Sequence, residues 1–160
     1  MKKLIIIALT LLAAMPTIAA PGKSFAFLIG KDPINVVLDY SLLQLQTIDR
    51  AEFDSVLPQH EAAWYILFLN QVNASNAEWK LSFGDYPEAR YTLSVLFIQA
   101  DAKAAMQAVF RIIDITTVSE VCSYVVSCRG GFYGSFYEIF SESVERIGEE
   151  IGDMIKDNMY

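Results

Sequence analysis

The sequence predicts an α+β domain of two layers, in which a mainly antiparallel sheet of about four strands carries helices chiefly on one face. Apolar residues alternate with polar ones in four separate segments, as they do in strands with two different faces. Three of these segments follow one another with short connections, which is typical of an antiparallel meander. The last segment repeats apolar residues every three or four positions, as an amphipathic helix does. The expected order is strand, helix, helix, three strands and a closing helix.

The first 19 residues have the three parts of a secretory signal peptide. A charged start at Met1–Lys3 precedes the apolar run Leu4–Met15, and small residues follow up to Ala19. The apolar run is shorter than the roughly 20 residues that span a bilayer. We therefore expect cleavage after Ala19, which leaves residues 20–160 as a single domain with no transmembrane span. Because no cysteine follows the run, no lipid-attachment signal is expected, and the predicted location is the periplasm or cell envelope.

Composition narrows the classes of partner. The sequence is 54% hydrophobic, which argues against a disordered chain. Its net charge is −7, and it becomes more negative when Lys2 and Lys3 leave with the leader. An acidic chain repels phosphate backbones, so nucleic-acid binding is not expected.

The two cysteines are interpreted as free thiols. In an extended strand, Cys122 and Cys128 would lie about 20 Å apart, whereas a disulfide needs Cα atoms within roughly 7 Å. His60 is the single histidine, and no pair of His or Cys residues has the spacing of metal ligands. The sequence therefore predicts no metal and no cofactor.

The first half of the domain is expected to contain one strand and two helices. We interpret residues 21–33 as a loosely held segment with room for a short strand, followed by a strand at Ile34–Tyr40. Asp49 with Glu52 three positions later predicts a capped start for a short helix that ends before Pro58.

A longer helix is expected at about Gln59–Lys80, and its stretch Trp64–Leu69 is apolar on every face. Such a helix is either deeply buried or shared with a partner, and a core helix is the simpler of the two interpretations.

The second half contains the meander and the closing helix. Strands are expected at 89–98, 106–112 and 122–128, with the helix at Phe136–Ile155. The opposite side of this helix carries most of the acidic residues, which predicts a solvated face. Two glycines in it, Gly148 and Gly152, each cost about 1 kcal/mol relative to Ala. We expect close approach of the helix backbone to the sheet as the compensation.

A glycine-rich segment, Arg129–Ser135, joins the last strand to the last helix. Such loops can hold phosphate, but the spacing matches neither the dinucleotide pattern nor the P-loop. Ser135 followed by Glu138 predicts a helix cap instead. Phe132 and Tyr133 beside these glycines indicate a contact surface.

Three stretches, 34–41, 89–95 and 130–136, resemble a group of small exported α/β proteins of Gram-negative bacteria whose function is unknown. The order of elements is similar too. The resemblance implies a fold and an envelope location, and it implies no known activity and no functional residue.

Function is predicted only in outline. We expect a non-catalytic exported envelope protein that binds another envelope protein or itself, with no catalytic residue. The candidate interaction surface consists of Trp64, Tyr65, Phe68, Phe132 and Tyr133. One alternative is a carrier of a small apolar ligand, with a pocket lined by Trp64, Tyr65, Phe68, Phe97 and Phe110. Another is a hydrolase, whose polar groups would come from His60, Asp39, Asp85 and Asp114.

Overall fold

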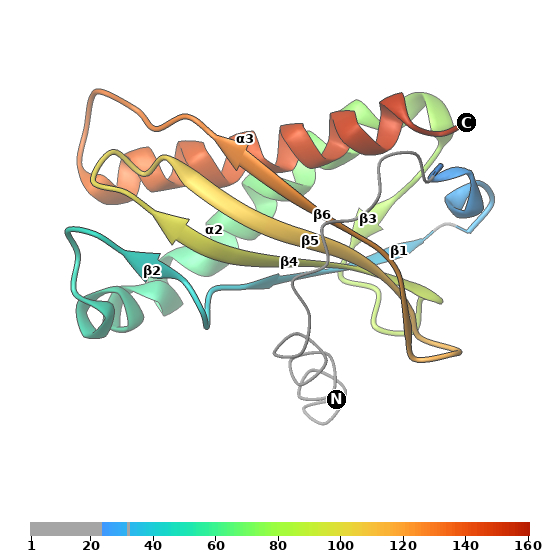
Figure 1. Cartoon of the computed structure of the whole chain (residues 1–160), viewed down its shortest axis with the longest axis horizontal. Helices are drawn as coiled ribbons and strands as arrows, with labels where there is room; N and C mark the ends of the chain where they lie inside the picture. The colour runs from blue at the N-terminus through green and yellow to red at the C-terminus, as the bar shows by residue number, and fades with distance from the viewer. Residues whose placement is uncertain (1–23, 32) are drawn as a thin grey trace.

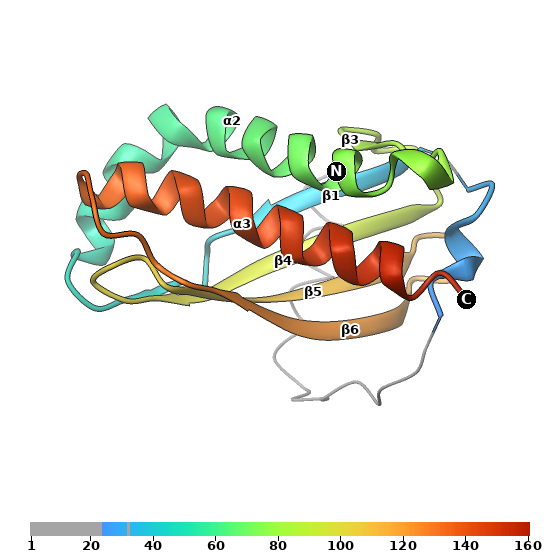
Figure 2. The same cartoon turned by 90° about the horizontal axis from the view of Figure 1, so that it is seen from above.

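The computed structural model describes residues 24–31 and 33–160, so the expected leader at 1–19 lies outside the described residues. Two long helices cover one face of a twisted sheet, as Figures 1 and 2 show. The described elements are η1 (Ala26–Leu28), β1 (Ile34–Asp39), β2 (Gln44–Leu45), α2 (Arg50–Ser75), η2 (Ala77–Trp79), β3 (Phe83–Gly84), β4 (Tyr91–Ala100), β5 (Met106–Asp114), β6 (Ser119–Cys128) and α3 (Phe136–Asp157).

The sheet has the strand order β3-β1-β4-β5-β6, and β2 pairs with β4 beyond the end of β1. The meander β4-β5-β6 is antiparallel and confirms the prediction for the second half. The prediction of a mainly antiparallel sheet of about four strands was correct only in part. Within the described residues the sheet has six strands and is mixed, because β1 pairs in parallel with β3 and β4, and β2 pairs in parallel with β4. The crossover through α2 returns the chain in its original direction, which gives parallel pairing. β2 and β3 have two residues each, too few to show an alternation.

The helix α2 is continuous where the sequence predicted two helices. Pro58 lies inside it. A proline cannot donate to the carbonyl four residues earlier, that of Asp54, but both residues are exposed, so water can reach that carbonyl. Asp49 precedes the helix in an extended conformation without a side-chain cap, so the predicted capping bond is absent there. The helix ends at Ser75 and not near Lys80.

The segment before β1 is docked onto the domain. The prediction of a loosely held segment was wrong for residues 24–31, because Phe25 and Leu28 are buried. The backbone N–H of Phe25 donates to the carbonyl of Asn158 at 2.8 Å, which ties this segment to the end of α3.

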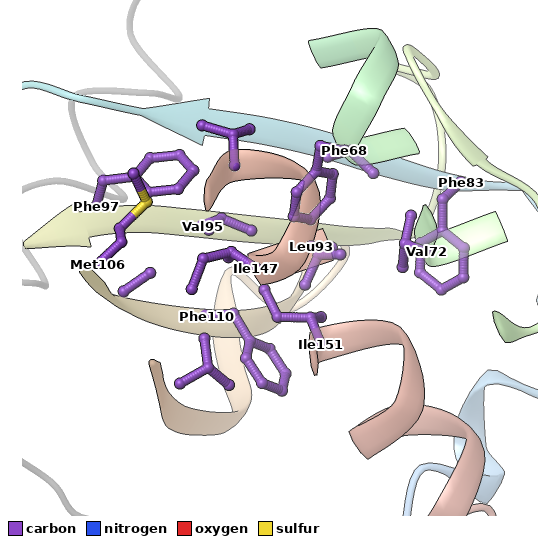
Figure 3. Close-up of a cluster of buried hydrophobic side chains, with 14 of the residues drawn as sticks. Phe68, Val72, Phe83, Leu93, Val95, Phe97, Met106, Phe110, Ile147 and Ile151 are labelled. Carbon is purple, nitrogen blue, oxygen red and sulfur yellow. The ribbon is translucent and has the colours of Figure 1, made fainter. Parts of the chain in front are cut away.

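The core lies between the helices and the sheet (Figure 3). Phe68 and Val72 of α2 and Ile147 and Ile151 of α3 point toward the strands. Their partners from the strands are Phe83, Leu93, Val95, Phe97, Met106 and Phe110. Each such buried side chain contributes roughly 1.5–3 kcal/mol. One continuous cluster joins these residues, and this cluster holds both layers together.

The two glycines of α3 face α2, not the sheet. A Cβ at Gly148 would lie 2.8 Å from the carbonyl oxygen of Phe68, and one at Gly152 would lie 2.8 Å from the Cβ of Ser75. The predicted close approach therefore exists, but the predicted partner was wrong. The two helices, which lie side by side in Figure 2, approach each other closely because α3 lacks a side chain at these two positions.

Candidate functional site

The structure separates the five predicted surface residues into two groups. Phe132 and Tyr133 are 78% and 91% exposed, at the loop between β6 and α3. Trp64 and Phe68 are fully buried, and Tyr65 is half-buried with its hydroxyl donating to the carbonyl of Val36 at 3.1 Å. Most of the apolar stretch of α2 is thus used within the chain itself, in contact with α3 and the sheet, whereas Ile66 remains 57% exposed. Of the five predicted surface residues, Phe132 and Tyr133 are the two that are exposed.

The buried aromatic residues pack against one another. The indole N–H of Trp64 donates to the Ser141 hydroxyl at 2.7 Å, and the ring of Tyr40 stacks on that of Phe97 at 4.7 Å. Neither of the two surface hollows described below is lined by any of the five residues proposed for an apolar pocket. The observation that suggested a carrier of small apolar ligands is therefore explained by the core.

The four polar residues considered for a hydrolase have separate partners. His60 is stacked between Trp64, at 5.1 Å, and Tyr137, at 5.4 Å. Asp39 accepts a bond from the backbone N–H of Ser41, and Asp114 is held by Arg90 and Thr116. Asp85 lies at a small hollow of about 370 Å³ beside Pro33 and Tyr86. The register sets Asp39 opposite Leu96 and Asp114 opposite Tyr91, on different sides of β4. This placement does not bring the four together.

Residues 24–31 and 33–160 are the part of the chain that the structure describes. In this part of the chain, no three His, Cys, Asp or Glu side chains are grouped as ligands for a metal ion. None of its helices has both the length and the apolar content needed to cross a bilayer. Cys122 and Cys128 lie on the same strand, β6, and are not joined in a disulfide, and burial raises the pKa of the Cys128 thiol.

Phe132 and Tyr133 belong to a segment, Gly130–Gly134, that we call the aromatic loop. The connection between β4 and β5 holds one part of this loop, because the N–H of Gly131 donates to the carbonyl of Lys103 at 2.9 Å. A Cβ at Gly130 would overlap that same carbonyl oxygen. Glycine is therefore required here so that the two backbones can lie in contact.

Residues of α3 also hold the aromatic loop in place. Arg146 donates from Nη1 to the carbonyl of Arg129 at 2.9 Å and approaches that of Gly130 at 3.4 Å. Ser135 and Glu138 form the predicted capping box, with the Ser135 N–H donating to the Glu138 carboxylate at 2.6 Å. These hydrogen bonds from Ser135 lower the pKa of Glu138.

The connection that supports the aromatic loop is itself well bonded. The Asp101 carboxylate accepts from the N–H groups of Lys103 and Ala105, both at 2.9 Å. Ala104 has a φ of 54°, in the left-handed region, and its carbonyl accepts from the buried Ser143 hydroxyl at 2.7 Å. The β4–β5 connection, the aromatic loop and α3 are therefore joined by hydrogen bonds next to the two exposed rings. Because this support is already ordered, less conformational entropy is lost when a partner binds there.

A surface hollow of about 1040 Å³ lies beside the aromatic loop, between the end of β6 and α3. Its charged lining residues are Asp101, Lys103, Arg129, Glu142, Arg146, Glu149 and Glu150. The Lys103 ammonium lies 5.0 Å from the centre of the Phe132 ring. The sequence indicated the two aromatic residues but not Lys103 or Arg146, because nothing local in the sequence marks side chains that meet across three segments.

Comparison with known proteins identifies the fold and no family. No protein-family model matches the sequence, and no curated protein matches it. The structure is similar to protein XCC0632 from Xanthomonas campestris, described with the family DUF330, with a TM-score of 0.51, 10% identity and coverage of 79% of this chain and 83% of that one. This likeness confirms, at the level of the fold, the resemblance to uncharacterised proteins of Gram-negative bacteria.

Two further solved structures share parts of the arrangement at lower similarity. The PelC dodecamer from Paraburkholderia phytofirmans has a TM-score of 0.49 and 14% identity, covering 82% of this chain and 95% of that chain. The lipoprotein GNA1162 from Neisseria meningitidis has a TM-score of 0.31 and 14% identity, covering 72% and 95%.

Proposed function

We propose that this chain is an exported, non-catalytic protein of the cell envelope that binds another protein, or a second copy of itself, through the aromatic loop. The observation that carries the proposal is the exposure of Phe132 and Tyr133 on a base fixed by α3 and the β4–β5 connection. Interface hot spots are enriched in aromatic residues and arginine, and a rigid support lowers the entropy lost on binding. The leader-like start of the sequence supports the exported location.

Site-specific photo-crosslinking in cells tests this proposal. A benzoylphenylalanine at Tyr133 is expected to give adducts of defined mass. The matched control is Val118, which is 52% exposed at the turn before β6, whereas the aromatic loop follows the other end of that strand. A crosslinker at the control position should not give the same adducts.

A second arm asks whether the rings themselves are needed. The crosslinker is placed at exposed Ala102, beside the aromatic loop, and the yield is compared with and without Phe132→Ser and Tyr133→Ser. Truncation of a hot-spot aromatic residue costs about 2 kcal/mol or more, close to thirtyfold in affinity, so the adducts should largely disappear. Equal adducts from positions 133 and 118, or an unchanged yield in the double variant, would contradict the proposal. An adduct between two copies of the chain would identify the partner as the chain itself.

A further inference from the structure

The hollow beside the aromatic loop contains carboxylates that the chain does not neutralise. Glu149 and Glu150 are exposed, and within the described residues neither has an ion pair. Two cations of the lining are engaged, because Arg146 binds backbone carbonyls and lies 3.5 Å from Glu142, while Lys103 lies over a ring. Arg129 is the one lining cation whose side chain has no such contact in the described part of the chain. The lining thus has four carboxylates against three cations, and Glu149 and Glu150, which have no ion pair within the described residues, both lie on α3.

The rings of the aromatic loop suit a cation as well. Phe132 already has the Lys103 ammonium 5.0 Å from its ring centre, which shows that an ammonium group can approach this loop. Tyr133 is 91% exposed, and no cation of the described residues lies over its ring. The face of a tyrosine ring attracts ammonium and guanidinium groups, and the methylene groups of Lys and Arg side chains pack on apolar surface.

We infer that the partner contributes a lysine- or arginine-bearing segment to this hollow, with its stems against Tyr133 and its charged ends at Glu149 and Glu150. The inference rests on the proposed function and names the chemistry of the partner. Charge complementarity selects this occupant, because the chain has a net charge of −7 and attracts a basic partner while repelling an acidic one. A neutral segment would cover two carboxylates without pairing them, which is unfavourable.

Fluorescence anisotropy with defined peptides tests the inference on the purified exported chain. The probe is a labelled peptide of alternating lysine and serine, compared with the same peptide carrying glutamine or glutamate in place of lysine. Only the lysine probe is expected to bind, and its affinity should fall when salt is raised from about 50 to about 300 mM. Tyr133→Ser should weaken it about threefold, as expected for loss of a cation–ring contact.

Charge-matched variants separate a local site from the general acidity of the chain. Glu149→Gln with Glu150→Gln should weaken binding of the lysine probe about fivefold, since each exposed ion pair is worth roughly a twofold to threefold change. Glu78→Gln with Glu88→Gln removes the same charge from exposed positions outside the hollow, and should change binding less than twofold. Far-UV circular dichroism checks that all variants remain folded.

Three results would overturn the inference: no binding of the lysine probe, equal binding of the glutamine probe, or equal weakening by the two variant pairs. Its failure differs from failure of the proposed function. If crosslinks from Tyr133 persist and Glu149→Gln with Glu150→Gln leaves their yield unchanged, the aromatic contact stands and the basic segment is excluded. If the crosslinks are absent, the proposed function itself fails.

Discussion

Replacing Gly148 with alanine tests whether α3 rests directly on the backbone of α2. The added Cβ would lie 2.8 Å from the carbonyl oxygen of Phe68 and 3.2 Å from its Cα. Both are backbone atoms, so no side-chain rotation can relieve the overlap, and one helix has to move. A shift of α3 would also disturb the packing of its neighbours Ile147 and Ile151 on the strands (Figure 3).

The magnitude follows from two opposing effects. Alanine is favoured over glycine inside a helix by about 1 kcal/mol. Inserting an extra methyl group into a close-packed contact costs typically about 1–3 kcal/mol, and the backbone overlap at Gly148 places this site in the upper part of that range. We therefore expect Gly148→Ala to lower the free energy of unfolding by about 1–2 kcal/mol, or the midpoint of thermal unfolding by about 3–8 °C.

Urea unfolding followed by circular dichroism is the appropriate assay, with Ala62→Gly and Glu149→Ala as controls. Ala62 is exposed on α2 and should lose about 1 kcal/mol, which calibrates the helix preference in this protein. Glu149 is the exposed neighbour of Gly148, and its replacement should change stability by less than about 0.5 kcal/mol. An increase in stability for Gly148→Ala, close to the value lost in Ala62→Gly, would refute the helix–helix contact.

Three other predictions address charge, burial and backbone strain. Hydrogen bonds from Arg90 and Thr116 lower the pKa of Asp114 to about 2. Its stabilising contribution is therefore present above about pH 4 and is lost as the pH falls toward 2. Asp114→Asn should flatten the dependence of the unfolding free energy on pH in that interval. Burial, with a smaller effect of the Asp85 charge, raises the pKa of Tyr65 to about 12, so its contribution is lost as the pH rises from about 10 to 12. Tyr65→Phe should remove one late component of the ultraviolet tyrosinate titration and leave a still later one, because burial raises the pKa of Tyr40 further. Val118 is exposed with a φ of 50°, which is unfavourable for a β-branched residue. Val118→Asn should therefore raise the free energy of unfolding by about 0.5–1 kcal/mol in urea titrations, because asparagine tolerates this conformation better. Destabilisation would show that the turn needs valine.

The elements that the sequence predicted correctly are those whose signal is local. The capping box at Ser135 and Glu138 depends on residues three positions apart, and the structure contains it. The alternation along the meander depends on neighbours two apart, and it places strands β4, β5 and β6 close to the predicted ranges. The exposure of Phe132 and Tyr133 was likewise indicated by the glycines next to them.

The misjudged elements depend on contacts between distant residues. Pro58 is a local signal for a helix end, but burial of Phe53 and Trp64 on either side of it favours one continuous helix. The apolar stretch at Trp64 was consistent with both a core and a partner surface. Its burial was decided by α3, which follows more than 70 residues later, as the bond from Trp64 to Ser141 shows.

The sequence alone determined the strands β1, β4, β5 and β6, where α3 begins, and that most of its acidic residues face solvent, but not β2, β3 or the continuity of α2. Only the tertiary structure decided that β1 runs parallel to β4, that α3 packs on α2 through Gly148, and that the aromatic loop shares a base with Lys103 and Arg146. The reason is physical. The periodicity of side chains is set by the geometry of a few consecutive residues, whereas the direction of pairing and the choice of packing partner depend on free energies gained only when distant segments meet.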